Sequence, residues 1–378
     1  MRRSRGLAAG FLAASLGSAA AEPPAPPVSP VGAAVTPLRA YAVEGVFQTA
    51  ERPPARDLSG IACKPAPEGA AQRLCVLIND SDRFAQVATL ADGRITPGPT
   101  VALLGDQASP ATVGAPPQGM ACSAGEAGFS DLDGEAVAYA EPFFYVLGSH
   151  GCSRKREYRP SRFLLARVRL DDQGRAMDQS GHGAESSANA LRLVETTFRL
   201  SEALRAAEPV GAHFGLDLGG PNGINVEGLA VLDGILYAGL RAPSLDGQAF
   251  LVSTSATALF TSDAPLAAKV LRLALGPDMG VRDLAPLPDG RLLVLAGPAQ
   301  DQIEVDFALF ALDLRDGGLT RLATLDDPGG TCTPRPRAVS GKPEAVLPLG
   351  FDENRLNVLI LFDSLPNGAP CEYSVPLR

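Results

Sequence analysis

Residues 226–240, VEGLAVLDGILYAGL, contain an acidic residue, a short apolar run, a Leu-Asp-Gly turn and a second apolar run. Asp-Gly between two apolar runs is typical of a tight β-hairpin. The pattern occurs five times, with its first run at 57–63, 134–139, 226–231, 282–287 and 343–348 and its second at 74–79, 143–148, 235–240, 291–296 and 356–361. The chain is therefore predicted to consist of repeated antiparallel units.

Each copy except the last is followed by one or two further strand-like runs. Four antiparallel strands per unit, repeated in series, are typical of a β-propeller. We predict an all-β fold, a propeller of five four-stranded blades, with six blades as the alternative if an insertion near 105–130 or 171–190 contains another. The fifth copy shows three strands, so an N-terminal strand near 39–48 is expected to supply the fourth and close the ring. A β-sandwich with coincidental repeats is the competing interpretation.

The composition agrees with a chain of many short strands. Among 378 residues, 40 are glycine and 33 are proline, which suits frequent turns. Hydrophobic residues make up 46% of the chain, enough for a large core, and this excludes wholesale disorder.

The N-terminus has the order of regions expected of a secretory signal peptide. Residues 1–21 contain Arg2, Arg3 and Arg5, then an apolar stretch, then three alanines. We predict cleavage, with an uncleaved anchor as the alternative, and no membrane span in the mature protein. Residues 22–38 are expected to form an extended, unpacked Pro/Ala linker, and residues 39–378 a single propeller domain. The expected location is the periplasm or the extracellular space.

The charge balance excludes two classes of partner. The net charge is −9, and cleavage of the leader would remove three arginines and no acid. An acidic protein without a basic run is a poor ligand for nucleic acid or anionic membranes.

Six cysteines in an exported chain favour three disulfides over metal or redox chemistry. The propeller topology brings the cysteines together two by two across a hairpin or on one face. The predicted pairs are Cys63–Cys75, Cys122–Cys152 and Cys332–Cys371. The second pair would fasten the first insertion to the loop that contains His150.

The functional site is expected at one end of the ring. In a propeller, the loops before the inner strands and the loops between the second and third strands lie on the same face, and here both sets are polar. The candidate ligand-binding residues in these loops are Asp57, Asp80, Arg83, Asp133, Arg154, Asn225, Arg241, Arg282 and Lys342.

Four of the five inner strands place an acid directly before their apolar pair, namely Glu135, Glu227, Asp283 and Glu344. Gathered carboxylates repel one another unless a cation offsets them. Two offsets are available: a Ca²⁺ ion with these four residues as ligands, or pairing with arginine and lysine side chains. The sequence leaves both open.

His150 is the one histidine in a predicted site loop. It could act as a general base or contact an anion, and a structural role against a backbone carbonyl is the alternative. His150, Glu135 and Glu227 form the predicted catalytic set. No nucleophile elbow, zinc motif, P-loop or dinucleotide fingerprint is present in the sequence.

Several segments resemble the bacterial exported domain-of-unknown-function family 3616, namely 58–62, 78–90, 148–154, 225–242 and 282–299. The resemblance runs from about Val43 to Tyr373; it supports the fold and implies no activity. The strand pattern is more loosely similar to phytase-like secreted propellers, some of which bind Ca²⁺ and cleave phosphate esters. Similarity of fold alone does not carry function.

Two functions are therefore predicted. The first is a calcium-assisted hydrolase of small anionic esters or phosphates, in which the carboxylates hold the ion and Arg83, Arg154 and Arg241 bind the anion. The alternative is a propeller that binds a ligand or a protein at the same place without turnover.

Overall fold

The computed structural model describes residues 32–66, 69–178, 180–183, 187–220, 222–326, 330–332, 341–352 and 354–377. The predicted signal peptide and residues 22–31 of the predicted linker lie outside these ranges.

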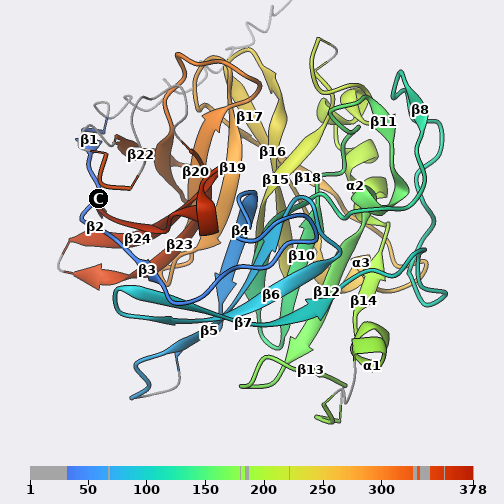
Figure 1. The fold of residues 1–378 in the computed structure, drawn as a ribbon. Helices are drawn as coiled ribbons and strands as arrows, with labels where there is room; N and C mark the ends of the chain where they lie inside the picture. Colours follow the sequence, from blue (N-terminus) through green and yellow to red (C-terminus); the bar gives the residue numbers. More distant parts are fainter. Residues whose placement is uncertain are drawn as a thin grey trace, which may run out of the picture. The chain divides into compact units, whose positions relative to one another are not determined.

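The described residues form a five-bladed β-propeller, as predicted (Figure 1). The first blade contains β4 (Leu58–Cys63), β5 (Arg73–Asn79), β6 (Phe84–Ala91) and β7 (Arg94–Ala102), and the second contains β9 (Gly134–Ala140), β10 (Phe143–Gly148) and β12 (Leu165–Leu170) with β13 (Ala176–Met177) and β14 (Glu195–Thr197) on its outer edge. The third contains β15 (Asn225–Leu232), β16 (Ile235–Leu245), β17 (Gln248–Ser255) and β18 (Lys269–Leu273), and the fourth contains β19 (Met279–Pro286), β20 (Leu292–Pro298), β21 (Ala308–Leu312) and β22 (Leu319–Leu325). The fifth contains β23 (Lys342–Asp352), β24 (Arg355–Asp363) and β25 (Cys371–Pro376).

The five inner strands close into a ring. Each of β4, β9, β15 and β19 contacts the inner strand of the next blade, and β23 contacts β4. Five apolar clusters fill the five spaces between neighbouring blades. Because successive side chains of a strand point to opposite faces, a strand between two such clusters must be apolar on both. The wholly buried strand β20, LLVLAGP, shows this requirement.

Glycine is required where the chain turns tightly or where inner strands approach closely. In the hairpin between β15 and β16, Asp233 and Gly234 both have positive φ, 50° and 75°, which is the conformation that Asp-Gly favours. On β4, a Cβ atom at Gly60 would lie 2.8 Å from the Cα of Ala136 on β9. The glycine therefore lets two inner strands meet near the axis.

The N-terminal segment pairs with three blades, whereas the sequence predicted one long strand and an unpacked linker. Strand β2 (Arg39–Ala40) is antiparallel to β25 and completes the fifth blade, which confirms the predicted closure. The closing strand is shorter than 39–48, because β3 (Ala42–Val43) leaves it to pair with β7 of the first blade. Strand β1 (Ala34–Val35) pairs with β22 of the fourth blade, so this part of the predicted linker is not unpacked.

The remaining elements before β15 lie in the connections from β7 to β9 and from β10 to β15, and among them β8 falls within the predicted insertion near 105–130. Strands β8 (Gly125–Glu126) and β11 (Glu157–Tyr158) pair with each other, and the helical elements there are η1 (Pro160–Phe163), α1 (Ser187–Arg192), α2 (Leu200–Ala206) and η2 (Val210–His213). The last two short helices are α3 (Ala256–Leu259) and η4 (Pro366–Gly368). In the described part of the chain, no helix has the length and apolar character needed to cross a bilayer.

All three predicted disulfides are present, Cys63–Cys75, Cys122–Cys152 and Cys332–Cys371. The first joins β4 to β5 within a blade. The second joins the first insertion to the loop after β10, as expected.

We expect the N-terminal pairings to stabilise the ring. A variant that lacks residues 1–43 loses β1, β2 and β3, with backbone hydrogen bonds such as Leu38 N–H to Glu372 O and Ala42 N–H to Gly93 O. At about 1 kcal/mol for each bond, the apparent Tm should fall by about 10 °C or more. Calorimetry against a variant that lacks only residues 1–31 provides the control. Equal Tm values for the two variants would contradict a closing role.

Candidate functional site

One end of the ring collects charged side chains from every blade. We call this end the mouth; it contains the residues that precede or begin the inner strands and those that follow the second strands. Electrostatic interactions link Glu135 to Asp80, Asp133, Glu227 and Glu344, and link Glu344 to Asp363 and Arg241. The predicted gathering of the two sets of loops therefore occurs. Within it, the charges form a buried part and an open part.

The buried part is an ion-pair cluster centred on Arg282 of β19. Its side chain is 2% exposed, and its Nε lies 3.0 Å from Oε2 of Glu227 on β15. A terminal nitrogen of the same guanidinium donates to Oε1 of Glu344 on β23. Arg241 on β16 donates to Oε1 of Glu227 at 2.8 Å. We call Glu227, Arg241, Arg282 and Glu344 the Arg282 cluster.

Two further polar groups complete this buried part. Asn225 donates from Nδ2 to Oε1 of Glu227 at 2.8 Å. Asp283 accepts the backbone N–H of Leu284 and that of Val346, each at 2.8 Å, and so joins β19 to β23. Burial raises the pKa of Asp283 well above its ordinary value. Burial also raises the pKa of Glu344, to about 8, although Arg282 lowers it.

These contacts involve three of the four predicted metal ligands. Glu227 and Glu344 are paired with arginines, and Asp283 is held by two backbone N–H groups. The structure thus shows the internal pairing that the sequence left open. No group of three or more His, Cys, Asp or Glu side chains within the described ranges is placed to hold a metal ion. Protein donors contact three of the four predicted ligands in this structure, and the Ca²⁺ site stays a prediction.

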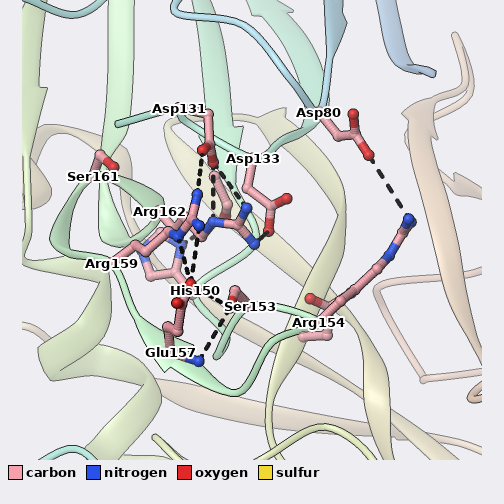
Figure 2. A network of polar contacts seen from close by, with 12 residues as sticks. Asp80, Asp131, Asp133, His150, Ser153, Arg154, Glu157, Arg159, Ser161 and Arg162 are labelled. Atoms are coloured by element: carbon pink, nitrogen blue, oxygen red, sulfur yellow. Dashed lines mark hydrogen bonds and ion pairs between the residues drawn. The ribbon is translucent and has the colours of Figure 1, made fainter. Parts of the chain in front are cut away.

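The open part of the mouth lies around Arg154, whose side chain is 88% exposed. Its guanidinium is 3.9 Å from a carboxylate oxygen of Asp80 (Figure 2). Burial, with a smaller contribution from Asp133 and Asp57, raises the pKa of Asp80 to about 7 against the opposing effects of the Ser81 hydrogen bond and Arg154. Asp57 is hydrogen-bonded to Asp363, and burial together with that neighbour raises the pKa of Asp57.

Glu135 differs from the other mouth carboxyl groups because it lacks a partner. Among the described residues it has neither a hydrogen bond nor an ion pair, and it is half-buried at the start of β9. Burial and the nearby charges of Glu227, Asp133 and Asp80 raise the pKa of Glu135 well above its ordinary value. The raised pKa favours the protonated form of Glu135.

A second ion-pair network fixes the loops beside the open part (Figure 2). Arg162 donates to Asp131 at 3.0 Å and to Asp133 at 2.8 Å. Arg159 donates to Asp131 at 2.8 Å and to Glu157 at 2.9 Å. The loop before β9 is thereby attached to the segment before β12, and Asp133 is held in place beside Glu135.

His150 is buried and contacts a backbone carbonyl, which is the contact expected for a structural role. Its side chain is 0% exposed, its Nδ1 lies 2.8 Å from the carbonyl oxygen of Gly148, and its ring packs on Phe163. Burial lowers the pKa of His150 to about 4, so the ring is neutral at pH 7. The ring is enclosed by protein atoms in this structure, and a catalytic role for His150 stays a prediction.

Two other predicted residues lie apart from the charge clusters. Arg83 donates to Asp106 at 2.7 Å and to the carbonyl oxygens of Gly105 and Phe129, so it anchors the first insertion. Lys342 is exposed and lies opposite Asp363 in the pairing of β23 with β24. The sequence reasoning omitted Asp363, Arg159 and Arg162 from the candidate set. The spacing of Asp131 and Asp133, opposite two nearby arginines, was the available signal.

The family comparison concerns the middle of the chain. Residues 157–316 match the family described as "Protein of unknown function (DUF3616)". The match confirms the resemblance predicted from the sequence over these residues, which run from β11 to the turn after β21. No curated protein matches the chain.

Several solved structures of low sequence identity are similar to the chain at low TM-scores. The chain is similar to an α-L-arabinofuranosidase from Podospora anserina in complex with cellotriose, with 12% identity, a TM-score of 0.45 and coverage of 92% of this chain and 96% of that one. A GH43 β-1,3-galactosidase has 8% identity, a TM-score of 0.42 and coverage of 90% and 60%. A thermostable family-43 glycoside hydrolase has 8% identity, a TM-score of 0.37 and coverage of 85% and 89%. These similarities carry no conclusion about activity.

We expect the Arg282 cluster to contribute strongly to stability. Replacing Arg282 with Met leaves the buried carboxyl group of Glu344 without its cation and leaves Glu227 with Arg241 alone, which should cost about 3–5 kcal/mol of the free energy of unfolding. The double variant Arg282→Met/Glu344→Gln, which keeps the Glu227–Arg241 pair, should regain most of this loss in urea denaturation. Arg315→Met, which removes an exposed pair with Asp313, is the control and should be unchanged. A double variant as unstable as the single one would contradict the charge explanation.

His150 should make stability depend on pH. Its pKa is about 4 when folded and 6.5 when unfolded, so the unfolded chain binds the proton more tightly between these values. Stability should therefore fall as the pH decreases from 6.5 to 4, by about 3 kcal/mol from this group. His150→Asn, which tolerates the positive φ of 52°, should remove this contribution. His182→Asn, at an exposed histidine, should leave the pH curve parallel to that of the wild type.

Proposed function

We propose that this protein is a hydrolase in which carboxyl groups of the mouth act as general acid and general base. The observation that carries the proposal is Glu135, which makes no hydrogen bond or ion pair among the described residues and interacts electrostatically with Asp80, whose pKa is raised to about 7. Neighbouring carboxyl groups with different protonation states are suited to acid and base roles in one reaction.

The proposed reaction needs only water as co-reactant. Asp80, when ionised, takes a proton from a water molecule as that water attacks the substrate. Glu135 gives its proton to the leaving-group oxygen as the bond to that oxygen breaks. Solvent then reprotonates Glu135 and removes the proton from Asp80, and Arg154 is positioned to hold Asp80 and to donate hydrogen bonds to the substrate.

The charge of the mouth favours a neutral or cationic substrate. Five carboxyl groups, Asp57, Asp80, Asp133, Glu135 and Asp363, interact with the exposed guanidinium of Arg154. An anion would meet this excess of negative charge, whereas a hydroxyl-rich neutral molecule can donate to the carboxylates. Glycosides are the first class to test, because their hydrolysis uses a protonated and an ionised carboxyl group. The anionic ester predicted from the sequence remains a prediction for the same assay.

Activity should depend on Glu135. We expect the purified protein to cleave neutral 4-nitrophenyl glycosides faster than 4-nitrophenyl phosphate, and Glu135→Gln to lower kcat/KM at least about 100-fold. Glu141→Gln, at the exposed turn after β9, is the matched control and should retain full activity. Equal loss in both variants, or none in either, would rule out the assignment of Glu135. Ligand binding without turnover would favour the non-catalytic alternative.

The pH profile separates the two roles. Asp80 must be ionised, so kcat/KM should rise through about pH 7 and fall at higher pH as Glu135 loses its proton. Asp80→Asn should remove the rise on the acidic side and lower the maximum rate. A profile that is unchanged in Asp80→Asn would exclude Asp80 as the base.

Calcium provides a further test, since the sequence predicted a calcium-assisted reaction. Because Glu227, Glu344 and Asp283 already accept bonds from protein donors, we expect a chelator to leave activity unchanged. Calorimetric titration with Ca²⁺ measures binding directly. Tight binding that is lost in Glu135→Gln/Glu227→Gln would support the metal site instead.

A further inference from the structure

A cavity of about 410 Å³ lies at the opposite end of the strands from the mouth, where the fifth blade meets the first. Strand β5 connects the two regions, because it begins at Arg73 in the cavity wall and ends at Asn79 beside Asp80. The other walls come from β2, β6, β23, β24 and β25. The volume is within the range of small-molecule sites in proteins.

Two arginines, Arg39 and Arg73, line the cavity, and Arg73 forms no ion pair with a carboxylate of the described residues. Its two terminal nitrogens both donate to one carbonyl oxygen, that of Pro348, at 3.2 and 3.3 Å. No carboxylate pairs with it among the described residues. By contrast, Arg39 in the same wall donates to both Glu372 and Asp92. Burial lowers the pKa of Arg73, which is the effect of removing a cation from water without supplying an anion.

The rest of the wall is suited to an apolar group. Leu90, Leu349 and Phe351 line the cavity, and the Phe351 side chain is 45% exposed there, which is unusual for a large apolar residue. The side-chain amide of Asn357, also in the wall, makes no hydrogen bond to the described part of the chain. A ligand could therefore bring one anionic group to Arg73 and an apolar body against the leucines and Phe351.

We propose that this cavity is a second binding site, specific for a small carboxylic acid with an apolar or aromatic body. The planar carboxylate matches the forked donors of a guanidinium, which a spherical anion does not. The site is separate from the mouth, so it does not depend on the proposed hydrolase activity.

Calorimetric titration of the full chain tests the site, with benzoate as the probe and benzamide as its uncharged counterpart. We expect saturable benzoate binding and much weaker benzamide binding, because the amide lacks the charge that Arg73 requires. Arg73→Gln should weaken benzoate binding about 10-fold or more.

A second variant blocks the space instead of the charge. A side chain at Gly350 would meet no atom within 4 Å, and the backbone there does not have the positive φ that disfavours other residues. Gly350→Leu should therefore fold normally, as shown by an unchanged Tm, and should abolish benzoate binding. Glu135→Gln, in the mouth, should bind benzoate as the wild type does.

The proposal would be overturned if benzamide bound as tightly as benzoate, or if both Arg73→Gln and Gly350→Leu bound benzoate as tightly as the wild type does. It would also be overturned if benzoate binding did not saturate through the millimolar range. Loss of benzoate binding in Glu135→Gln would place the ligand at the mouth, and would also overturn it.

Discussion

Arg282 joins three blades through one buried guanidinium group. Its partners, Glu227 and Glu344, belong to the inner strands on either side of its own, so the ion pairs run around the axis where no apolar cluster lies. Once these charges are out of water, each requires the others, because an unpaired charge in such a place is costly. The same contacts also occupy the carboxylates of Glu227 and Glu344. A ligand or substrate that bound these two carboxylates would therefore compete with the ion pairs that stabilise the ring.

The open half of the mouth has a different balance. Its carboxyl groups outnumber the guanidinium of Arg154, and burial raises the pKa of Asp80 to about 7 and that of Glu135 well above its ordinary value. A raised pKa favours the protonated form of a carboxyl group, so protonation can reduce the repulsion between these acids where no cation does. Carboxyl groups whose pKa values differ in this way are suited to act as acid and base in one site.

The repeated hairpins made the fold predictable. Asp-Gly turns and apolar runs are local features, and five copies left few arrangements other than a ring with a strand borrowed from the N-terminus. The disulfides followed, since that topology brings the cysteines together in pairs. For the N-terminal strands β1, β2 and β3, the sequence predicted only the pairing that completes the fifth blade. Such two-residue strands have no pattern of their own and form because three outer edges offer unpaired backbone groups.

The sequence by itself predicted five blades, with six as the alternative, and indicated the end of the ring at which polar residues gather and the residue types that gather there. Only the tertiary structure decided which of these residues pair. Glu135, Glu227 and Glu344 occupy equivalent places in their repeats. Glu227 and Glu344 form ion pairs with buried arginines, whereas Glu135 forms no ion pair with the described residues. Partners in a ring come from neighbouring blades, at distances that depend on side-chain reach and burial. Likewise, no local feature of the sequence shows whether the His150 side chain is exposed in its loop or buried against Phe163.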